Sequence, residues 1–190
     1  YYASRGLGDV YKRQVYMFQI GDVVFYPQHG VGIIDCIEEK EINGETKSYY
    51  EFHLINNPMK IVLPLDKVEN FHVRLISDTD TIDYILMDIS NRLANFSEFA
   101  DYNYKDRKEK FIEKMKIGTI ENYLEVIYIL TKLKIKHELN STEGQFLYRS
   151  KKIVIEEISI AKNLSKDEAI DLLEYAISCL LYTSPSPRDA

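Results

Sequence analysis

The sequence predicts an α+β protein of two domains, in which a small β-barrel is followed by a compact five-helix domain. Two observations lead to this prediction. Short runs rich in Ile, Val and Tyr, separated by frequent turns, fill residues 17–75, and that pattern is typical of small barrels. From residue 76 onward the apolar side chains follow a helical spacing instead. The 190 residues suffice for two small domains with real hydrophobic cores.

The first domain is expected to contain four strands joined by tight turns. They are predicted at residues 23–26, 32–41, 48–55 and 60–63. Asn43 and Gly44 separate the two longer runs, and this dipeptide readily takes the positive φ angles of a type I′ hairpin turn. Because the strands are short and the turns frequent, we expect the barrel to be of the SH3 or Tudor type.

The second domain is expected to contain five helices. Residues typical of helix starts are Asp80, Thr119, Asn140 and Ser165. Asn140 and Ser165 are each followed three residues later by a Glu, which is the spacing of a capping box. A further helix carries the basic residues that follow Tyr104. The boundary between the domains is predicted at residues 74–79, where the strand spacing gives way to the helical one.

Both ends of the chain differ from the rest. Residues 1–16 and 179–190 do not continue the spacing of the neighbouring elements, and they resemble translated sequencing-adapter sequence. We therefore expect two non-native tails around a native protein of residues 17–178; the alternative is a pair of native disordered tails. Of the two cysteines, Cys36 then remains, and it is expected to be an inert packed thiol in a strand.

The sequence carries no recognisable catalytic or metal-binding motif. Its four histidines and two cysteines show no zinc-ligand spacing. Gly30 and Gly32 frame a single residue, but a third Gly is missing and a strand follows, so a tight turn is a better interpretation than a phosphate loop. No catalytic residue, cofactor or metal is therefore expected. An enzyme would require a deep pocket with convergent polar side chains.

The hydropathy of the sequence indicates where in the cell the protein is expected. The sequence has no apolar run of about 18 residues, so a membrane-spanning helix is not expected. The N-terminus also lacks the apolar core of a signal peptide. Both observations predict a cytoplasmic protein.

Charge is unevenly distributed along this acidic chain. The net charge is −6, yet residues 104–152 hold 12 basic and 7 acidic side chains. The basic residues form two clusters, one of Lys105, Arg107, Lys108, Lys110, Lys114 and Lys116, and one of Arg149, Lys151 and Lys152. Such a face can hold DNA phosphates. Glu109 and Glu113 equally allow the simpler interpretation of a solvated helix with i,i+4 charge pairs.

Residues 20–32, Ile-Gly-Asp-Val-Val-Phe-Tyr-Pro-Gln-His-Gly-Val-Gly, resemble the opening signature of the CarD/CdnL family of bacterial transcription regulators. The hairpin at Asn43, the segment at residues 59–64 and the downstream helices keep the order of that family. The resemblance covers residues 17–178. The same Tudor-like module occurs in the transcription-repair coupling factor, but no helicase motifs fit in a chain of this length.

The resemblance implies that the first domain binds the lobe of the RNA polymerase β subunit through an exposed sheet edge. The family uses a basic position near the hairpin, which Lys40 matches. A second basic position, on the strand before a proline, is occupied here by Val62. This departure predicts a more apolar contact. The predicted polymerase-binding set is completed by Tyr26, Pro27 and His29 of the signature.

The resemblance also implies that the helical domain contacts DNA at the upstream edge of the transcription bubble. The family uses an Asn-Trp pair there, with the Trp wedged into the minor groove, and Asn103-Tyr104 falls on this pair. Tyr104 keeps an aromatic face but is smaller than indole, so a weaker wedge is expected. Its alternative interpretation is a surface tyrosine at a helix start. The residues predicted to hold DNA phosphates are Lys105, Arg107, Lys108, Lys110, Arg149 and Lys151.

The implied function is a transcription regulator that binds RNA polymerase and stabilises the open promoter complex. The wedge would favour melted DNA over the closed duplex, and would shift the equilibrium by that difference in affinity. Binding to promoter DNA alone is expected to be weak and insensitive to sequence. We expect a monomer that associates with the nucleoid through polymerase. The alternative is a Tudor-like protein- or RNA-binding module whose helical domain is purely structural.

Overall fold

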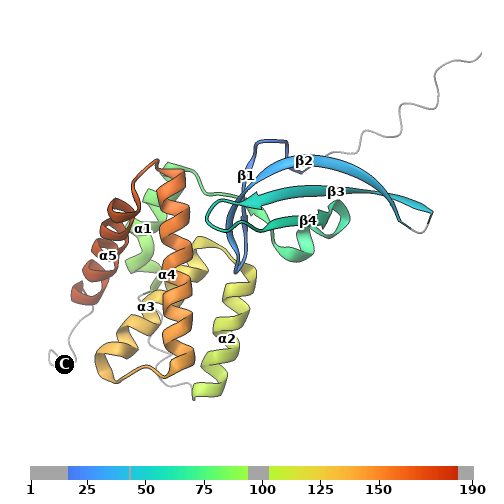
Figure 1. Cartoon of the computed structure of the whole chain (residues 1–190). Helices are drawn as coiled ribbons and strands as arrows, with labels where there is room; N and C mark the ends of the chain where they lie inside the picture. Colours follow the sequence, from blue (N-terminus) through green and yellow to red (C-terminus); the bar gives the residue numbers. More distant parts are fainter. Residues whose placement is uncertain (1–16, 43, 94–102, 184–190) are drawn as a thin grey trace, which may run out of the picture.

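Figure 1 shows the computed structural model of the chain, in which a sheet module and a helical module lie side by side. The structure describes residues 17–42, 44–93 and 103–183. The predicted tail at 1–16 lies outside this range, as do residues 184–190 of the predicted tail at 179–190, whereas residues 179–183 belong to the last helix. An antiparallel sheet is followed by five helices, which confirms the α+β class.

The sheet module has five antiparallel strands in the order β4-β3-β2-β1-β5. They are β1 (Val23–Tyr26), β2 (Gly30–Ile42), β3 (Glu45–Leu54), β4 (Lys60–Pro64) and β5 (Arg74–Leu75). The first four agree closely with the predicted strands, whereas β5 was not predicted. The sheet is not closed into the expected barrel. Its last strand has two residues and pairs with β1, and the 3-10 turns η1 (Leu65–Lys67) and η2 (Glu69–Phe71) occupy the connection from β4.

Alternation along β3 shows why this segment folds as a strand. Tyr50, Phe52 and Leu54 are buried, and the residues between them are only half-buried. The buried face completes a small core that also contains Phe18, Val24, Ile34, Leu63, Val68 and Val73. Gly44 takes a φ of 81° in the hairpin between β2 and β3, as the turn prediction requires. Asn43 of the same turn lies outside the described residues.

The helical module consists of α1 (Thr79–Leu93), α2 (Tyr104–Ile117), α3 (Ile120–Lys136), α4 (Ser141–Ala161) and α5 (Lys166–Thr183). Two of the predicted helix starts are capped as expected: the Thr119 side chain accepts from Asn122 N, and Asn140 forms a full capping box with Glu143. The start expected at Asp80 is wrong by two residues, because Asp78 Oδ1 accepts from Thr81 N at 2.7 Å and Asp80 lies in the first turn of α1. Helix α5 continues five residues past its predicted end at Ser178, since no helix breaker precedes Pro185.

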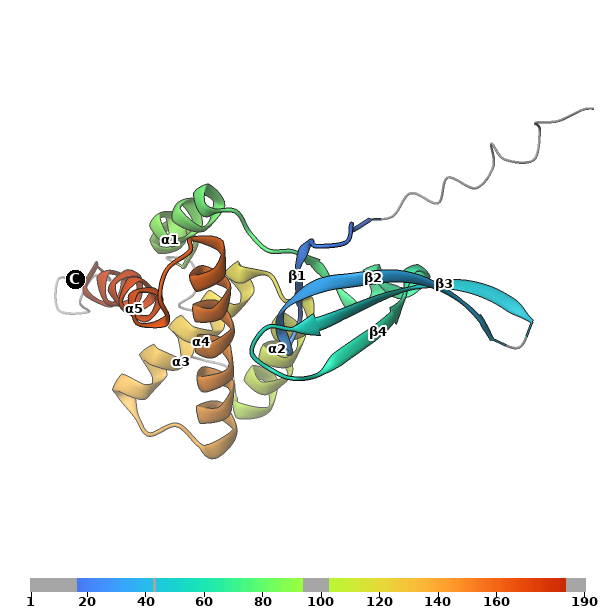
Figure 2. The same ribbon diagram turned by 45° about the horizontal axis from the view of Figure 1, so that its top comes forward.

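Figure 2 shows α3 and α4 side by side in the helical module, with the β2–β3 hairpin projecting away from it. Helix α3 carries the largest share of the core, and α4 packs along it. Among the helices described, none combines the length and apolarity that a membrane crossing requires.

The two modules share part of their packing. Phe25 of β1 and Val31 of β2 are fully buried in the same core cluster as the side chains of α3 and α4. We use the name junction for the region where β1, β2 and β5 meet α3, α4 and the turn at Gly118. Residues 74–79, where the sequence predicts a domain boundary, contain β5 and the start of α1, and the apolar core is shared by residues on both sides of them.

Candidate nucleic-acid and protein interfaces

The outward face of the sheet carries Lys40 and Val62, two of the residues assigned to a protein partner. The pairing register places Val62 of β4 beside Glu51 of β3, and Glu51 beside Cys36 of β2. These side chains therefore form one row across three strands. Lys40 lies four residues beyond Cys36 on the same strand, so it points to the same face. Val62 is 46% exposed, and the structure thus brings both predicted residues to one accessible surface.

Strand β4 is also an edge of the sheet. It begins the strand order, and β3 is its only strand partner within the described residues. The exposed side chains of Met59 and Val62 follow this edge, and Lys60 is neutralised by an ion pair with Glu51. An open edge of this kind can accept an extended segment of another protein through main-chain hydrogen bonds.

Tyr26, Pro27 and His29 do not share that surface, and their assignment to the protein partner stays a prediction. Pro27 is buried at the junction, where a Cβ on Gly118 would come within 2.5 Å of its ring. The Tyr26 ring packs edge-on against the core of the sheet module and stacks on the His29 ring, with 4.5 Å between centroids. Pro27 therefore lies at the junction, whereas Tyr26 packs on the core of the sheet module and the exposed His29 ring stacks on Tyr26.

The outward row contains one set of potential metal ligands. Cys36, Glu38 and Glu51 place their ligand atoms within 4.8 Å of one another. Both carboxylates are already engaged, Glu38 by Lys40 at 3.2 Å and Glu51 by Lys60. The Lys40 ammonium lowers the pKa of Glu38, whereas desolvation and the nearby carboxylates raise the pKa of the Cys36 thiol. A protonated thiol between two paired carboxylates is a poor metal site.

The predicted Asn-Tyr pair lies at the start of α2. Asn103 is the N-cap: its Oδ1 accepts from Asp106 N at 3.1 Å, and its Nδ2 donates to Asp106 Oδ2 at 2.8 Å. Tyr104 is the first residue of the helix, and its side chain is 41% exposed. Asn103 therefore fixes the direction in which the helix begins, and Tyr104 is the side chain that this start presents to solvent.

Two lysines accompany Tyr104 on the exposed side of α2. Lys105 and Lys108 are exposed, and Lys110 is half-buried. The N-terminus of the helix adds the positive end of its macrodipole, which favours an anion such as phosphate. The structure thus gathers an aromatic ring, exposed cations and a helix N-terminus within one turn.

Arg107 is different and belongs to the packing of the bundle. Its side chain is only 12% exposed, and Nη2 donates to Glu143 Oε1 at 3.0 Å. Phe111 and Met115 follow it at intervals of four residues and are buried, so Arg107 lies on the inward face of α2. This spacing was visible in the sequence. We assign the guanidinium to the contact between α2 and α4, and not to DNA.

The predicted basic residues of α4 point in different directions. Lys151 is half-buried and lies 3.5 Å from Glu174 of α5. Arg149 is exposed and lines a cavity beside the β1–β2 turn. Two residues correspond to about 200° around a helix, so these side chains cannot act on one surface. The structure does not join them to the cluster at the start of α2.

The junction contains a buried ion pair. Arg74 donates to both carboxylate oxygens of Glu157, at 2.7 and 2.9 Å, and to the carbonyl of Gly118 at 3.2 Å. Its guanidinium carbon lies 4.3 Å from the centroid of the Phe25 ring. Glu157 is fully buried and also accepts from Ser77 N at 2.9 Å. Both carboxylate oxygens of Glu157 therefore accept charge-assisted hydrogen bonds from Arg74, as a buried carboxylate requires.

Sequence reasoning did not identify this pair, although one signal was present. Glu157 lies within the apolar run 153–160 of a helix whose face must be buried. A carboxylate in such a position needs a cation from elsewhere in the chain. The sequence does not show which cation, since Arg74 is 83 residues away.

Tyr123 forms a second polar link across the junction. Its hydroxyl accepts from Gln28 N at 3.1 Å and donates to the Met115 carbonyl at 3.1 Å. Burial raises the pKa of this hydroxyl to about 12. The β1–β2 turn is thereby tied to both α2 and α3.

Two family models match the chain. The CarD-like/TRCF RID domain matches residues 18–77, and the CarD C-terminal domain matches residues 88–174. A protein of Bacillus subtilis (strain 168) with the description "Putative transcription factor YdeB" is 30% identical over 156 residues, which is 80% of this chain and 97% of that protein. The two matched segments correspond to the sheet module and to the greater part of the helical module.

Proposed function

This chain belongs to the CarD/CdnL family of transcription factors, and from that premise we propose that it binds the lobe of the RNA polymerase β subunit and stabilises the open promoter complex. The observation that carries this proposal is the placement of two exposed surfaces on two modules with a shared core. One is the outward sheet face with its open edge, and the other is the start of α2 with Tyr104.

The polymerase contact is proposed at β4 and the adjoining outward face. An extended segment of the β subunit would pair with the outer edge of β4, and main-chain hydrogen bonds would supply most of the affinity. Val62 would contribute apolar area, and Lys40 would exchange its exposed partner Glu38 for an acidic group of the polymerase. Association with the nucleoid would follow from this contact.

The DNA contact is proposed at the start of α2. Tyr104 would insert its ring at the upstream edge of the bubble, where unpaired bases offer stacking partners. Asn103 would position that ring by capping the helix, and Lys105 and Lys108 would hold phosphates on either side. We include Lys110 as a weaker contact and leave out Arg107, because its charge is occupied by Glu143.

The mechanism is a shift of the equilibrium between closed and open promoter complexes. Only contacts that are stronger in the open complex can stabilise it. Phosphate contacts are similar in both states, whereas stacking on a splayed base exists only when the strands separate. Tyr104 would therefore supply the differential affinity and the lysines the general affinity. No catalytic step is part of this proposal.

The test compares open-complex lifetimes on one promoter with purified polymerase. Tyr104→Ala is expected to shorten the lifetime by about tenfold, which corresponds to the loss of one stacked aromatic of roughly 1–3 kcal/mol. Tyr104→Trp is expected to lengthen it, since indole offers a larger stacking area. Tyr175→Ala is the matched control, because Tyr175 of α5 is also exposed, at 71%.

Co-purification with core polymerase is measured for each variant, so that docking and wedge are separated. Tyr104→Ala should retain polymerase binding, and Val62→Asp should weaken it because a carboxylate replaces an apolar contact. An unchanged open-complex lifetime in Tyr104→Ala, with polymerase binding intact, would rule out the wedge. Failure of the wild-type protein to co-purify with polymerase would rule out the docking proposal.

A further inference from the structure

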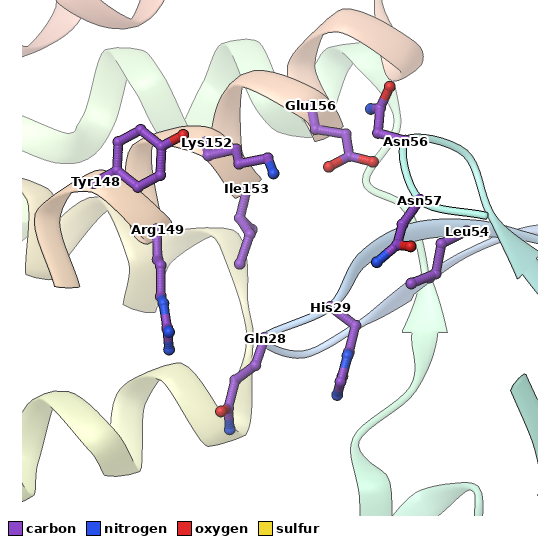
Figure 3. A pocket seen from close by; sticks show the side chains of 10 residues that line it. All are labelled: Gln28, His29, Leu54, Asn56, Asn57, Tyr148, Arg149, Lys152, Ile153 and Glu156. Atoms are coloured by element: carbon purple, nitrogen blue, oxygen red, sulfur yellow. The ribbon is translucent and has the colours of Figure 1, made fainter. Parts of the chain in front are cut away.

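A polar cavity of about 440 Å³ lies at the junction, between α4 and the turns of the sheet module (Figure 3). One wall comes from the β1–β2 turn and from the β3–β4 turn, and the other from the middle of α4. We call it the junction groove. Its size falls in the range of small-ligand sites. It exists only when the modules are packed together, because each supplies one wall.

One face of α4 gives the groove its charge. Arg149, Lys152, Ile153 and Glu156 follow the i, i+3, i+4, i+7 spacing of a single helix face, and all four line the cavity. Arg149 and Lys152 are exposed, and neither forms an ion pair within the described part of the chain. This contrasts with their neighbour Lys151, which pairs with Glu174 on another side of the same helix. Two cations therefore line the groove without a direct ion pair, and Lys152 has the Glu156 carboxylate one helical turn away as a weaker electrostatic neighbour.

The carboxylate of Glu156 is held in place at one end of the groove. It accepts from Val31 N at 3.4 Å and from the side chain of Asn56. Oε2 lies so close to Gly30 that a Cβ there would be 2.9 Å away. Burial raises the pKa of this carboxyl group, although Lys152 and Lys166 counteract the effect. Glu156 is therefore an oriented acceptor for a hydroxyl or amino group.

The opposite wall offers side chains that can donate and accept hydrogen bonds. Gln28, His29 and Asn57 line it, and Figure 3 shows the Asn57 amide on the side of the groove that faces Lys152 and Glu156. A second cavity of about 420 Å³ shares Lys152 and Glu156 with the first and continues along α4. The accessible space is consequently longer than a single phosphate requires. Arg149 lines the first cavity, Lys152 is shared by both, and Lys166 lines the second, so cations are spread along its length.

We propose that the junction groove binds a small phosphorylated ligand with hydroxyl or amino donors, which is the chemistry of a nucleotide. Arg149 and Lys152 bind the phosphoryl oxygens by charge-assisted hydrogen bonds. Glu156 and Asn57 bind the ribose hydroxyls or the amino group of the base. Because the ligand touches both modules, binding stabilises their packed arrangement. This site contains none of the residues assigned to the DNA contact at the start of α2, and it adds a ligand to the proposed function.

Calorimetric titration of the whole chain with ATP, GTP, tripolyphosphate, adenosine and a short duplex DNA tests the site. ATP or GTP is expected to bind, and adenosine to bind much more weakly because it lacks phosphate. Lys152→Ala is expected to lower nucleotide affinity by about tenfold or more, as the loss of one charge-assisted hydrogen bond does. Lys134→Ala is the matched control, since Lys134 is an exposed lysine of α3 outside the groove, and it should bind nucleotide as the wild type does.

Hydrogen exchange provides a readout that calorimetry does not. Bound nucleotide should slow amide exchange both at residues 28–31 and at residues 56–57, because the ligand bridges these turns to α4. The proposal is overturned if neither nucleotide binds, or if Lys152→Ala and Lys134→Ala reduce binding equally. It is also overturned if tripolyphosphate binds as tightly as ATP, which would leave Glu156 and Asn57 without a role. A response to duplex DNA alone would assign the groove to the DNA backbone instead.

Discussion

The junction contains a buried ion pair, whereas the outward face of the sheet carries exposed ion pairs. At the junction, Glu157 is fully buried, and both of its oxygens bind Arg74. On the outward face, the pair of Lys40 and Glu38 is 40% and 49% exposed, and such pairs contribute little to stability. Strong pairing therefore fixes the modules to each other, whereas the outward charges can exchange partners at low cost. The first arrangement suits a framework, and the second suits a surface that binds another protein.

The largest expected effect comes from breaking the buried pair. Arg74→Ala leaves the Glu157 carboxylate buried without its cation, and we expect the free energy of unfolding to fall by about 3–5 kcal/mol. The change also removes two hydrogen bonds to the Gly118 carbonyl and the contact with the Phe25 ring. Urea denaturation at neutral pH, followed by circular dichroism, measures the loss.

The control for this change lies on the outward face. Lys40→Ala removes one partner of an exposed pair and should leave the midpoint of urea denaturation almost unchanged. Similar losses in the two variants would contradict the distinction between the junction and the outward face. The methionine pair Arg74→Met with Glu157→Met should recover much of the stability, since a buried ion pair can be replaced by apolar side chains.

Two glycines with positive φ angles allow the packing at the junction to be compared with that in the β2–β3 hairpin of the sheet. Gly118 at the junction and Gly44 in the projecting hairpin take similar φ angles, of 74° and 81°. A Cβ on Gly118 would meet Pro27 at 2.5 Å, whereas nothing lies within 4 Å of one on Gly44. Gly44→Ala should cost about 1 kcal/mol through backbone strain alone. Gly118→Ala should cost roughly 2–4 kcal/mol, because strain and overpacking add.

Thermal unfolding of the two alanine variants measures this difference. Gly118→Ala is expected to lower the melting temperature several degrees further than Gly44→Ala does. Equal shifts would mean that Pro27 moves aside without cost and that the junction is more pliant than its contacts indicate. A second variant, Gly118→Asn, tolerates the left-handed φ better than Ala and separates strain from overpacking.

Local signals in the sequence predicted most of the fold. The hairpin at Gly44 follows from the preference of Asn-Gly for positive φ angles, and the start of α4 follows from the capping box of Asn140 and Glu143. Strand β5 escaped prediction because its two residues carry no alternation of their own and are held by pairing with β1. The open form of the sheet has the same origin, since closure depends on a long-range pairing that no local pattern specifies.

Long-range contacts also explain why some predicted site residues are accessible in the structure and others are not. Lys40, Val62 and Tyr104 were placed by a resemblance in sequence, and each is accessible in the structure. Arg107 and Arg74 are used inside the protein, because each has a buried acidic partner on α4, far away in sequence. A sequence reports that a residue is basic, but whether its charge is available to DNA depends on such distant partners.

The smallest expected effect concerns folding stability: the contributions of Glu156 and Glu168 to it should change with pH in opposite directions. Burial at the junction raises the pKa of Glu156 above its ordinary value near 4.5, whereas hydrogen bonds from Ser165 lower the pKa of Glu168 at the exposed start of α5. The folded protein therefore holds the Glu156 proton more tightly than the unfolded chain does. The stability supplied by protonated Glu156 is present below pH 4.5 and is lost as the pH rises through the pKa of the folded state.

Urea denaturation of Glu156→Gln and Glu168→Gln is compared with that of the wild type across this pH range. For each variant, the comparison gives the slope with pH of the difference in free energy of unfolding. Glutamine keeps an acceptor for Val31 N but does not ionise, so Glu156→Gln should gain stability relative to wild type as the pH rises. Glu168→Gln should lose stability relative to wild type over the same rise, because the ionised carboxylate caps α5 better than an amide. Slopes of the same sign in the two variants would show that Glu156 is as well solvated as a surface carboxylate. In that case the junction groove would lie open to bulk water, and its carboxylate would be a weaker acceptor for a ligand than its contacts with Val31 and Asn56 indicate.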